Sequence, residues 1–419
     1  MSALLRQLAL VDAPRLQPDF WLARAADADE PLLTPAQAAA FNRRVHQALA
    51  LPDPLDLPDA LPADEVRALM AQAAPQTRPL YGGDGQPVSS ERLAELLARL
   101  DLPLPAQVPA QFGLVVKLAG ARALPAHAIL TAEPLAFQTN LLQETVVDIA
   151  APAAVLATSA DTRWSFCLTP LYWGWLPRDA LAAASRDEAR AFRRAAADDF
   201  VIATASYGLI GAAQGDSQAV HMGVRLPLLE ETPETWRVWL PSVKKGKLQE
   251  TVGTVSRRAG AFQRGWPPPT RRTLLTAAFS LLGEPYAWGG LIAGTFYGRD
   301  CSRFVQDVYA LTGVALPRNS GQQRQVCAVR LDFAPDTPPD ERRALIAAHA
   351  RPGDIVWLPG HVMLYLGAVD GEPHVIHATG GPQMAVVVST LDLYAGAPGG
   401  SLLERVRSVV YPAPPAGEG

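Results

Sequence analysis

The first 110 residues of the chain carry the capping and spacing signals of helices. Thr34 and Pro35 precede an Ala-rich stretch that runs to Leu51, and a capping Thr followed by Pro at the first position predicts a helix there. A second helix is predicted over residues 89–100, and a Pro- and Asp-rich stretch separates the two. We therefore expect a helical N-terminal region over residues 1–112.

From about residue 113 the sequence changes to short apolar runs of residues that favour β-strands, interrupted by Gly, Pro and Asp. A charged, Ala-rich segment over residues 186–198 divides these runs into two groups. We interpret the groups as two small β-barrels in tandem, at residues 113–185 and 186–262; the alternative is a single irregular β-domain. The predicted strands are Thr145–Ile149, Ala154–Thr158, Trp164–Leu168, Trp173–Leu176, Phe200–Thr204, Val220–Leu226 and Trp236–Leu240.

Three consecutive prolines, at residues 267–269, stop any helix or strand and separate the last third of the chain from the rest. Beyond them, apolar residues recur at helical spacing over residues 274–282 and again over residues 304–312. Strand-like runs follow and end in a hairpin. Residues 270–413 are therefore expected to form a separate α+β domain, which makes the chain a multidomain protein.

Composition narrows the classes of protein that fit this organisation. The chain is 49% hydrophobic and 19% charged, which is typical of folded globular domains. Its net charge of −4 and the lack of a basic stripe argue against a nucleic-acid partner. No stretch reaches the roughly 18 to 20 apolar residues of a transmembrane segment, and charged residues interrupt the start of the chain where a secretory signal would be apolar.

One of the three cysteines has the position of a nucleophile. Cys167, Cys301 and Cys327 have neither metal-ligand spacing nor the even count of a disulfide framework, so we expect no metal and no cofactor. Asp300 is a natural N-cap, which puts Cys301 in the first turn of a helix. We predict that the helix N-terminus lowers the pKa of this thiol and that its free N–H groups stabilise an oxyanion. The alternative is a buried structural thiol.

The register of the hairpin decides whether two histidines can work together. A two-residue turn at Asp370-Gly371 would pair His377 with Leu364 and put His377 and His361 on opposite faces. A five-residue loop over residues 367–371 would pair His361 directly with His377. We predict the five-residue loop, because only that register of the two supports a catalytic pair.

The predicted register assigns a role to each histidine. His361 would accept the proton of Cys301, and His377 would fix the tautomer and orientation of His361, as the carboxylate does in other triads. His374, on the same strand as His377, is expected at an exposed edge.

Six short motifs occur in order in the last third of the chain: Pro-Tyr-Ala-Trp-Gly-Gly at 285–290, Asp-Cys-Ser at 300–302, Leu-Pro-Arg-Asn-Ser at 316–320, Arg-Pro-Gly-Asp at 351–354, Gly-His-Val at 360–362 and Ile-His-Ala at 376–378. Together they resemble the NlpC-type cysteine peptidases, over about residues 270–412. The resemblance implies a papain-like domain with Cys301 as nucleophile, His361 as base and His377 as the third member of a triad. It also implies that Tyr286 binds substrate and polarises the reacting carbonyl.

Upstream segments at residues 137–139, 161–164 and 172–175 are similar in kind to the first barrel of one group in this family. These γ-D-glutamyl-L-diamino acid endopeptidases have a helical N-terminal segment and two bacterial Src-homology-3-like barrels before the catalytic domain. The resemblance implies that the first barrel closes one end of the cleft, with Tyr172 as its aromatic. It further implies that Asp300, Ser302 and Ser320 bind the free N-terminal amine of the substrate.

The chain also departs from the family pattern. Arg303 stands where many relatives have Gly, and Arg299 is placed to pair with Asp300. The acidic barrel residue expected to help hold the amine has two candidates, Glu133 and Glu144.

The expected function is hydrolysis of the γ-D-glutamyl to diamino-acid amide bond in peptidoglycan stem peptides with a free N-terminal L-Ala. Action in the cell envelope or periplasm is expected from the resemblance, and recycling of released peptides in the cytoplasm is the alternative. Two other classes stay open: a catalytically silent cell-wall-binding protein, and an acyl or amide transferase on the same scaffold.

Overall fold

The computed structural model describes residues 10–72, 79–170, 172–212, 217–292, 294 and 296–413. The chain divides into two compact units. Unit 1 consists of residues 1–50, 266–286 and 299–419, and unit 2 consists of residues 51–265 and 287–298. None of the described helices is long and apolar enough to cross a membrane.

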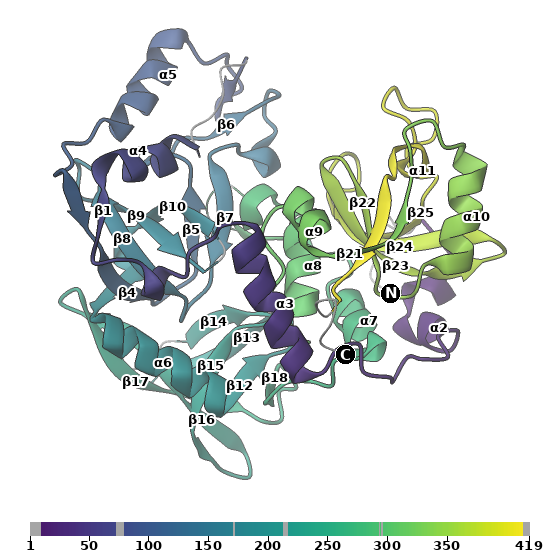
Figure 1. The fold of residues 1–419 in the computed structure, drawn as a ribbon, viewed down its shortest axis with the longest axis horizontal. Coiled ribbons are helices and arrows are strands. Elements are labelled where there is room, and N and C mark those ends of the chain that lie inside the picture. The colour runs from purple at the N-terminus through teal and green to yellow at the C-terminus, as the bar shows by residue number, and fades with distance from the viewer. Residues whose placement is uncertain are drawn as a thin grey trace. The chain divides into compact units, whose positions relative to one another are not determined.

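Unit 1 is built on a six-stranded antiparallel sheet, green to yellow in Figure 1. Helix α8 packs against β23 and β24, and α10 and α11 contribute to a core that includes Ile346, Met363 and Tyr365, each at most 1% exposed. In spatial order the strands are β21 (Ala328–Asp332), β26 (Ser408–Tyr411), β22 (Ile355–Leu358), β23 (His361–Val369), β24 (Glu372–Thr379) and β25 (Ala385–Thr390). The helices are α7 (Arg271–Ser280), α8 (Cys301–Ala310), α9 (Ser320–Val326), α10 (Pro339–His349) and α11 (Leu402–Arg405).

An N-terminal segment, residues 10–50, also packs within unit 1. It contains η1 (Ala13–Leu16), α2 (Pro18–Leu22) and α3 (Pro35–Ala48). Helix α3 confirms the first predicted helix: Thr34 Oγ1 accepts the Gln37 N–H, and the Gln37 side chain accepts the Thr34 N–H. Arg44 on α3 donates to the Val326 carbonyl at 2.8 Å, and α2 packs against α7 (Figure 1).

Unit 2 contains a fourteen-stranded sheet that runs through two groups of strands. Parallel pairing of β11 with β17, at Ala183 and Lys247, joins the groups. The first group is β4 (Gln111–Val115), β5 (Ala119–Arg122), β7 (Gln143–Val147), β8 (Pro152–Thr158), β9 (Trp164–Thr169), β10 (Tyr172–Pro177) and β11 (Leu181–Ala184). The second is β12 (Phe200–Ala203), β13 (Tyr207–Ala212), β14 (Ser217–His221), β15 (Arg225–Glu231), β16 (Thr235–Lys244), β17 (Lys247–Ser256) and β18 (Phe262–Arg264).

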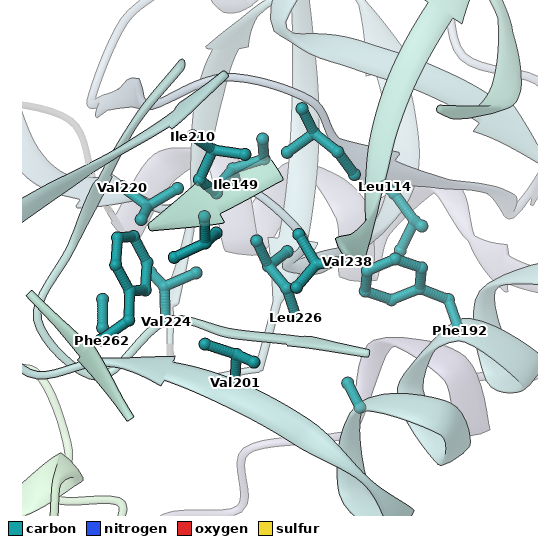
Figure 2. Close-up of a cluster of buried hydrophobic side chains, with 14 of the residues drawn as sticks. Leu114, Ile149, Phe192, Val201, Ile210, Val220, Val224, Leu226, Val238 and Phe262 are labelled. Carbon is teal, nitrogen blue, oxygen red and sulfur yellow. The ribbon is translucent and has the colours of Figure 1, made fainter. Parts of the chain in front are cut away.

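Each group of strands has a hydrophobic core of its own. The core of the first group includes Phe166 and Trp175, both fully buried. Figure 2 shows the core around the second group, where Val201 and Val238 lie near Phe192 of α6 (Arg186–Asp198). The two groups remain connected, because Leu114 of β4 belongs to the core of the second group and the pairing of β11 with β17 makes the sheet continuous. The predicted domain boundaries stay a prediction.

The remaining elements complete unit 2. Helices α4 (Ala63–Gln72) and α5 (Ser90–Leu97) belong to it, and Ser89 caps α5 as expected for the second predicted helix, so the helices of residues 1–112 are divided between the units. Gly289 has a φ of +64°, and a Cβ there would lie 2.3 Å from the Gln143 carbonyl oxygen, so only glycine fits. The short elements are β1 (Ala60–Pro62), β2 (Tyr81–Gly82), β3 (Gln107–Pro109), β6 (Leu130–Thr131), η6 (Trp288–Gly290), β19 (Leu291–Ile292) and β20 (Phe296–Tyr297).

Candidate active site

The thiol of Cys301 lies at the N-terminal end of α8. Asp300 caps this helix as predicted, since its Oδ1 accepts the Arg303 N–H at 2.9 Å. Cys301 is only 8% exposed. The backbone of Val362, the residue after His361 on β23, lies close enough to the sulfur to favour its charged form and lower its pKa. Unit 1 therefore brings the start of α8 to the start of β23.

His361 and His377 form a hydrogen-bonded pair of imidazoles. His361 Nε2 is 2.8 Å from His377 Nδ1, and His377 Nε2 is 3.1 Å from Ser389 Oγ on β25. One consistent assignment puts a proton on Nε2 of both rings, so that His361 donates to His377 and His377 donates to Ser389. This assignment leaves His361 Nδ1 unprotonated and able to accept the proton of Cys301.

The register that produces this pair differs from the predicted one, so the five-residue loop and the direct pairing of His361 with His377 are wrong. The hairpin turns tightly at Asp370-Gly371, but a β-bulge just after Tyr365 shifts the register by one residue and pairs Tyr365 with Val375. Side chains alternate along each strand, so His361 shares a face with Tyr365, and His377 shares it with Val375. The bulge, and not a longer loop, therefore puts His361 and His377 on the same face of the sheet.

Burial sets the protonation states of the site. It raises the pKa of Cys301 to about 12, with the Asp300 charge as a second cause, and it lowers the pKa of His361 to about 4. Burial and the neighbouring His361 lower the pKa of His377 well below its usual value. The predicted low-pKa thiol is therefore wrong, because loss of hydration outweighs the helix N-terminus. At neutral pH the site holds a neutral thiol and neutral imidazoles, so proton transfer must accompany any attack by sulfur.

A buried ion pair lies beside the nucleophile. Arg318 contacts both oxygens of Asp300, with Nη1 3.1 Å from Oδ1 and Nη2 bonded to Oδ2. Arg318 Nη1 is also 2.8 Å from Ser302 Oγ, which in turn donates to Asp300 at 3.2 Å. The structure thus brings two predicted substrate residues together and adds Arg318, which sequence reasoning missed although it stands in the Leu-Pro-Arg-Asn-Ser motif.

The unexpected Arg303 has a partner within its own helix. Arg303 Nε donates to Asp307 Oδ1 at 2.6 Å, and Arg299 Nε donates to the other oxygen of Asp307 at 2.8 Å. Arg299 also forms an ion pair with Glu284. Arg299 thus pairs with Asp307 and Glu284, and Arg318 forms an ion pair with Asp300.

Two further predicted site residues, Tyr286 and Ser320, also belong to unit 1. Tyr286 is 8% exposed, and burial together with the charges of Cys301 and Asp300 raises the pKa of its phenol, which stays a neutral donor. This electrostatic influence places Tyr286 near the thiol. Ser320 begins α9 and is half-buried. Their roles toward substrate stay predictions.

The predicted barrel residue, Tyr172, lies in unit 2 at the start of β10. Its hydroxyl is hydrogen-bonded to Glu144 on β7, and its ring stacks on Trp173 at 5.6 Å between centroids. Of the two candidate acidic residues, Glu144 has this contact with Tyr172, and Glu133 is exposed.

The other thiols show no sign of chemistry of this kind. Cys167 and Cys327 are free and buried, and burial raises the pKa of both. Within the part of the chain that the structure describes, no group of three or more His, Cys, Asp or Glu side chains is arranged to hold a metal ion.

A buried thiol at a helix N-terminus, next to a hairpin whose two strands each carry one histidine of a bonded pair, defines a nucleophilic cysteine–histidine site on an antiparallel sheet. Comparison with known families assigns it further: residues 283–393 match the NlpC/P60 family, and residues 136–177 match an SH3 domain of the SH3b1 type. The chain therefore carries an NlpC/P60 domain and an SH3b domain, which confirms the resemblance seen in the sequence.

Curated relatives share part of this chain. It is 31% identical over 155 residues to the gamma-D-glutamyl-L-lysine dipeptidyl-peptidase of Bacillus cereus, covering 36% of this chain and 43% of that protein. It is 35% identical over 99 residues to the probable endopeptidase p60 of Listeria innocua, covering 22% of this chain and 17% of that protein. The chain thus spans less than half the length of these relatives.

Solved structures share the fold over a larger part. An NlpC/P60 endopeptidase from Photobacterium damselae subsp. piscicida covers 93% of this chain, and 95% of its own, with a TM-score of 0.72 at 16% identity. An NlpC/P60 family protein from Bacillus cereus covers 72% of this chain, and 100% of its own, with a TM-score of 0.53 at 21% identity. At these identities the likeness concerns the fold alone.

Proposed function

We propose that the protein is a cysteine endopeptidase that hydrolyses the γ-D-glutamyl to diamino-acid amide bond of peptidoglycan stem peptides. The observation that carries this proposal is the placement of Cys301 at the start of α8, beside the strand that presents His361 to His377. The NlpC/P60 match and the relative named for a γ-D-glutamyl-L-lysine bond support the bond type. The SH3b domain supports a role at the cell envelope.

The reaction begins with attack of the Cys301 sulfur on the amide carbon while His361 Nδ1 takes the thiol proton. The oxyanion that forms is stabilised by the backbone N–H groups at the start of α8 and by the neutral phenol of Tyr286. Protonated His361 then gives its proton to the amine, which leaves as the diamino-acid fragment, and a thioester remains. A water molecule, deprotonated by His361, hydrolyses the thioester and restores the thiol.

His377 keeps His361 in the tautomer that this cycle needs. Because His377 is neutral, it stabilises the imidazolium of His361 as a hydrogen-bond acceptor without a full negative charge. Ser389 fixes His377 in turn, since its hydroxyl accepts from His377 Nε2 at 3.1 Å. This pattern supports positioning as the main contribution of the third residue.

Preference for a free N-terminal L-Ala is the finer part of the proposal. Asp300, Ser302 and Ser320, which all lie in unit 1, are assigned to the amine end. Carboxylates and hydroxyls are the groups that satisfy an ammonium ion removed from water. The Asp300 carboxylate is paired with Arg318, so an incoming ammonium ion would share this carboxylate with the guanidinium.

The test uses L-Ala-γ-D-Glu-diaminopimelate with a free and with an acylated N-terminus, followed by mass spectrometry of the products. We expect cleavage between D-Glu and the diamino acid for the free-amine peptide only, and no cleavage by Cys301→Ala. Equal cleavage of both peptides would remove the amine preference. Binding without cleavage, or products of transfer to a second amine, would contradict the hydrolase assignment.

A further inference from the structure

The bulge on β23 determines which face His377 occupies, so whatever holds the bulge acts on the candidate active site. The extra residue of the bulge is Leu366, 1% exposed. Gly367, which follows it, has a φ of +142°, a conformation that side-chain-bearing residues rarely adopt. Without the bulge the tight turn would put His377 on the face opposite His361. The productive arrangement therefore depends on one extra residue.

Trp21 of α2 covers this bulge. The side chain is fully buried, and a Cβ on Gly367 would lie 3.4 Å from the Trp21 ring, so the indole rests directly against the backbone of the bulge. On the neighbouring strand the residue paired with Gly367 is His374, whose ring centroid is 5.2 Å from that of Trp21. A hydrogen bond of 2.9 Å from the indole N–H to the Arg15 carbonyl fixes the ring.

The side chain of His374 has a contact at each ring nitrogen. It is only 1% exposed, so its predicted position at an exposed edge is wrong. Its Nδ1 is 2.8 Å from the Glu372 carbonyl oxygen, and its Nε2 is 3.5 Å from Arg15 Nη1. The N-terminal segment therefore contacts both strands of the hairpin at the Gly367–His374 pair: Trp21 packs against the bulge in β23, and Arg15 lies beside His374 in β24.

We infer that the N-terminal segment, through Trp21, is a positioning element that holds the bulge and with it the His361–His377 hydrogen bond. The inference deepens the proposed function and rests on it for the catalytic consequence. The bulge leaves an unpaired residue in the ladder, so the packing of Trp21 is what favours this register over the regular one. Trp21 does not touch the reacting atoms, and its effect passes through the hairpin.

The kinetic test compares Trp21→Ala and Trp21→Phe with Phe41→Ala. Phe41 is also fully buried in the N-terminal segment but lies on α3, so it controls for loss of stability without contact with the bulge. We expect Trp21→Ala to lower kcat at least about tenfold with little change in KM, because misplacing a catalytic group costs rate rather than ground-state binding. Trp21→Phe should restore most of kcat, and Phe41→Ala should keep it when rates are scaled to folded protein. Equal losses in Trp21→Ala and Phe41→Ala would overturn the inference.

A second measurement needs no substrate. In ¹⁵N spectra of the imidazoles, the wild type should show a hydrogen-bonded Nε2–H on His361, and Trp21→Ala should lose it while Phe41→Ala keeps it. If Trp21→Ala does not fold, His374→Gln, which removes the ring that packs against the same indole, takes its place. A wild type that cleaves no stem peptide but has the bonded pair would refute the proposed function alone. Retention of the bonded pair in Trp21→Ala would refute the inference alone.

Discussion

The low pKa of His361 has a measurable consequence for stability. The imidazole is kept neutral in the folded protein down to about pH 4, whereas in the unfolded chain it titrates near its ordinary value of 6.5. As the pH falls below 6.5, His361 becomes protonated in the unfolded state but stays neutral in the folded state, so the free energy of unfolding decreases. A drop in pKa from 6.5 to about 4, at 1.36 kcal/mol per pKa unit, lowers the free energy of unfolding by about 3 kcal/mol between pH 7 and pH 4.

The assay is urea unfolding of the wild type and of His361→Gln across this pH range. The carboxylates and the other histidines are present in both proteins, so their contributions largely cancel in the comparison. As the pH falls from 7 to 4, we expect the free energy of unfolding of the wild type to decrease by about 3 kcal/mol more than that of the variant. In the wild type, the acid limb of kcat/KM should also fall near pH 4, because His361 must be unprotonated to act as base.

Parallel pH dependence in the two proteins would refute the reasoning. An acid limb near pH 6.5 together with that parallel pH dependence would mean that the imidazole is hydrated in the free enzyme. A limb near pH 6.5 with a normal stability difference would instead point to a second titrating group in the reaction.

Three other changes test particular contacts. Arg318→Met should lower the free energy of unfolding by about 3 to 5 kcal/mol, because it removes one member of a buried ion pair, and adding Asp300→Asn should recover part of that loss; urea unfolding of the single and double variants measures both. Ser389→Ala should lower kcat by about threefold to tenfold with KM unchanged, since it removes a hydrogen bond from the positioning residue alone; steady-state kinetics would contradict this if only KM moved. Gly289→Ala should lower Tm far more than Gly294→Ala, because both have positive φ but only the first places its Cβ against a carbonyl oxygen of β7; equal shifts in thermal unfolding would attribute the effect to backbone strain alone.

Local signals were sufficient for several helix starts and for choosing Cys301, His361 and His377 as a group. The capping residues Thr34, Ser89 and Asp300 mark helix starts that the structure contains, because a cap is decided within three or four residues. The position of Cys301 in the first turn of α8 follows from the same local rule. Motif order along the chain was enough to place Cys301, His361 and His377 in one domain.

Features that depend on distant contacts could not be predicted from the sequence. The bulge is a choice between registers that differ by one residue, and it is covered by Trp21, more than 300 residues away in the chain. The pKa of Cys301 was predicted from its helix position alone, whereas burial by the surrounding fold reverses the direction of the shift. His374 was expected to be exposed because nothing near it in sequence shows that Arg15 and Trp21 cover it.

The division of unit 1 along the chain constrains the order of its synthesis. Its first 50 residues find their partners only after residue 266, with almost all of unit 2 made in between. At a synthesis rate of about 5 to 20 residues per second, the aromatic residues of the first segment have no packing partners for roughly 10 to 40 s. The position of β26 between β21 and β22 delays completion of the sheet further, because these two strands can join only through residues 408–411. The nascent chain therefore cannot complete unit 1 until residues 408–411 have been made, while its SH3b domain can fold long before.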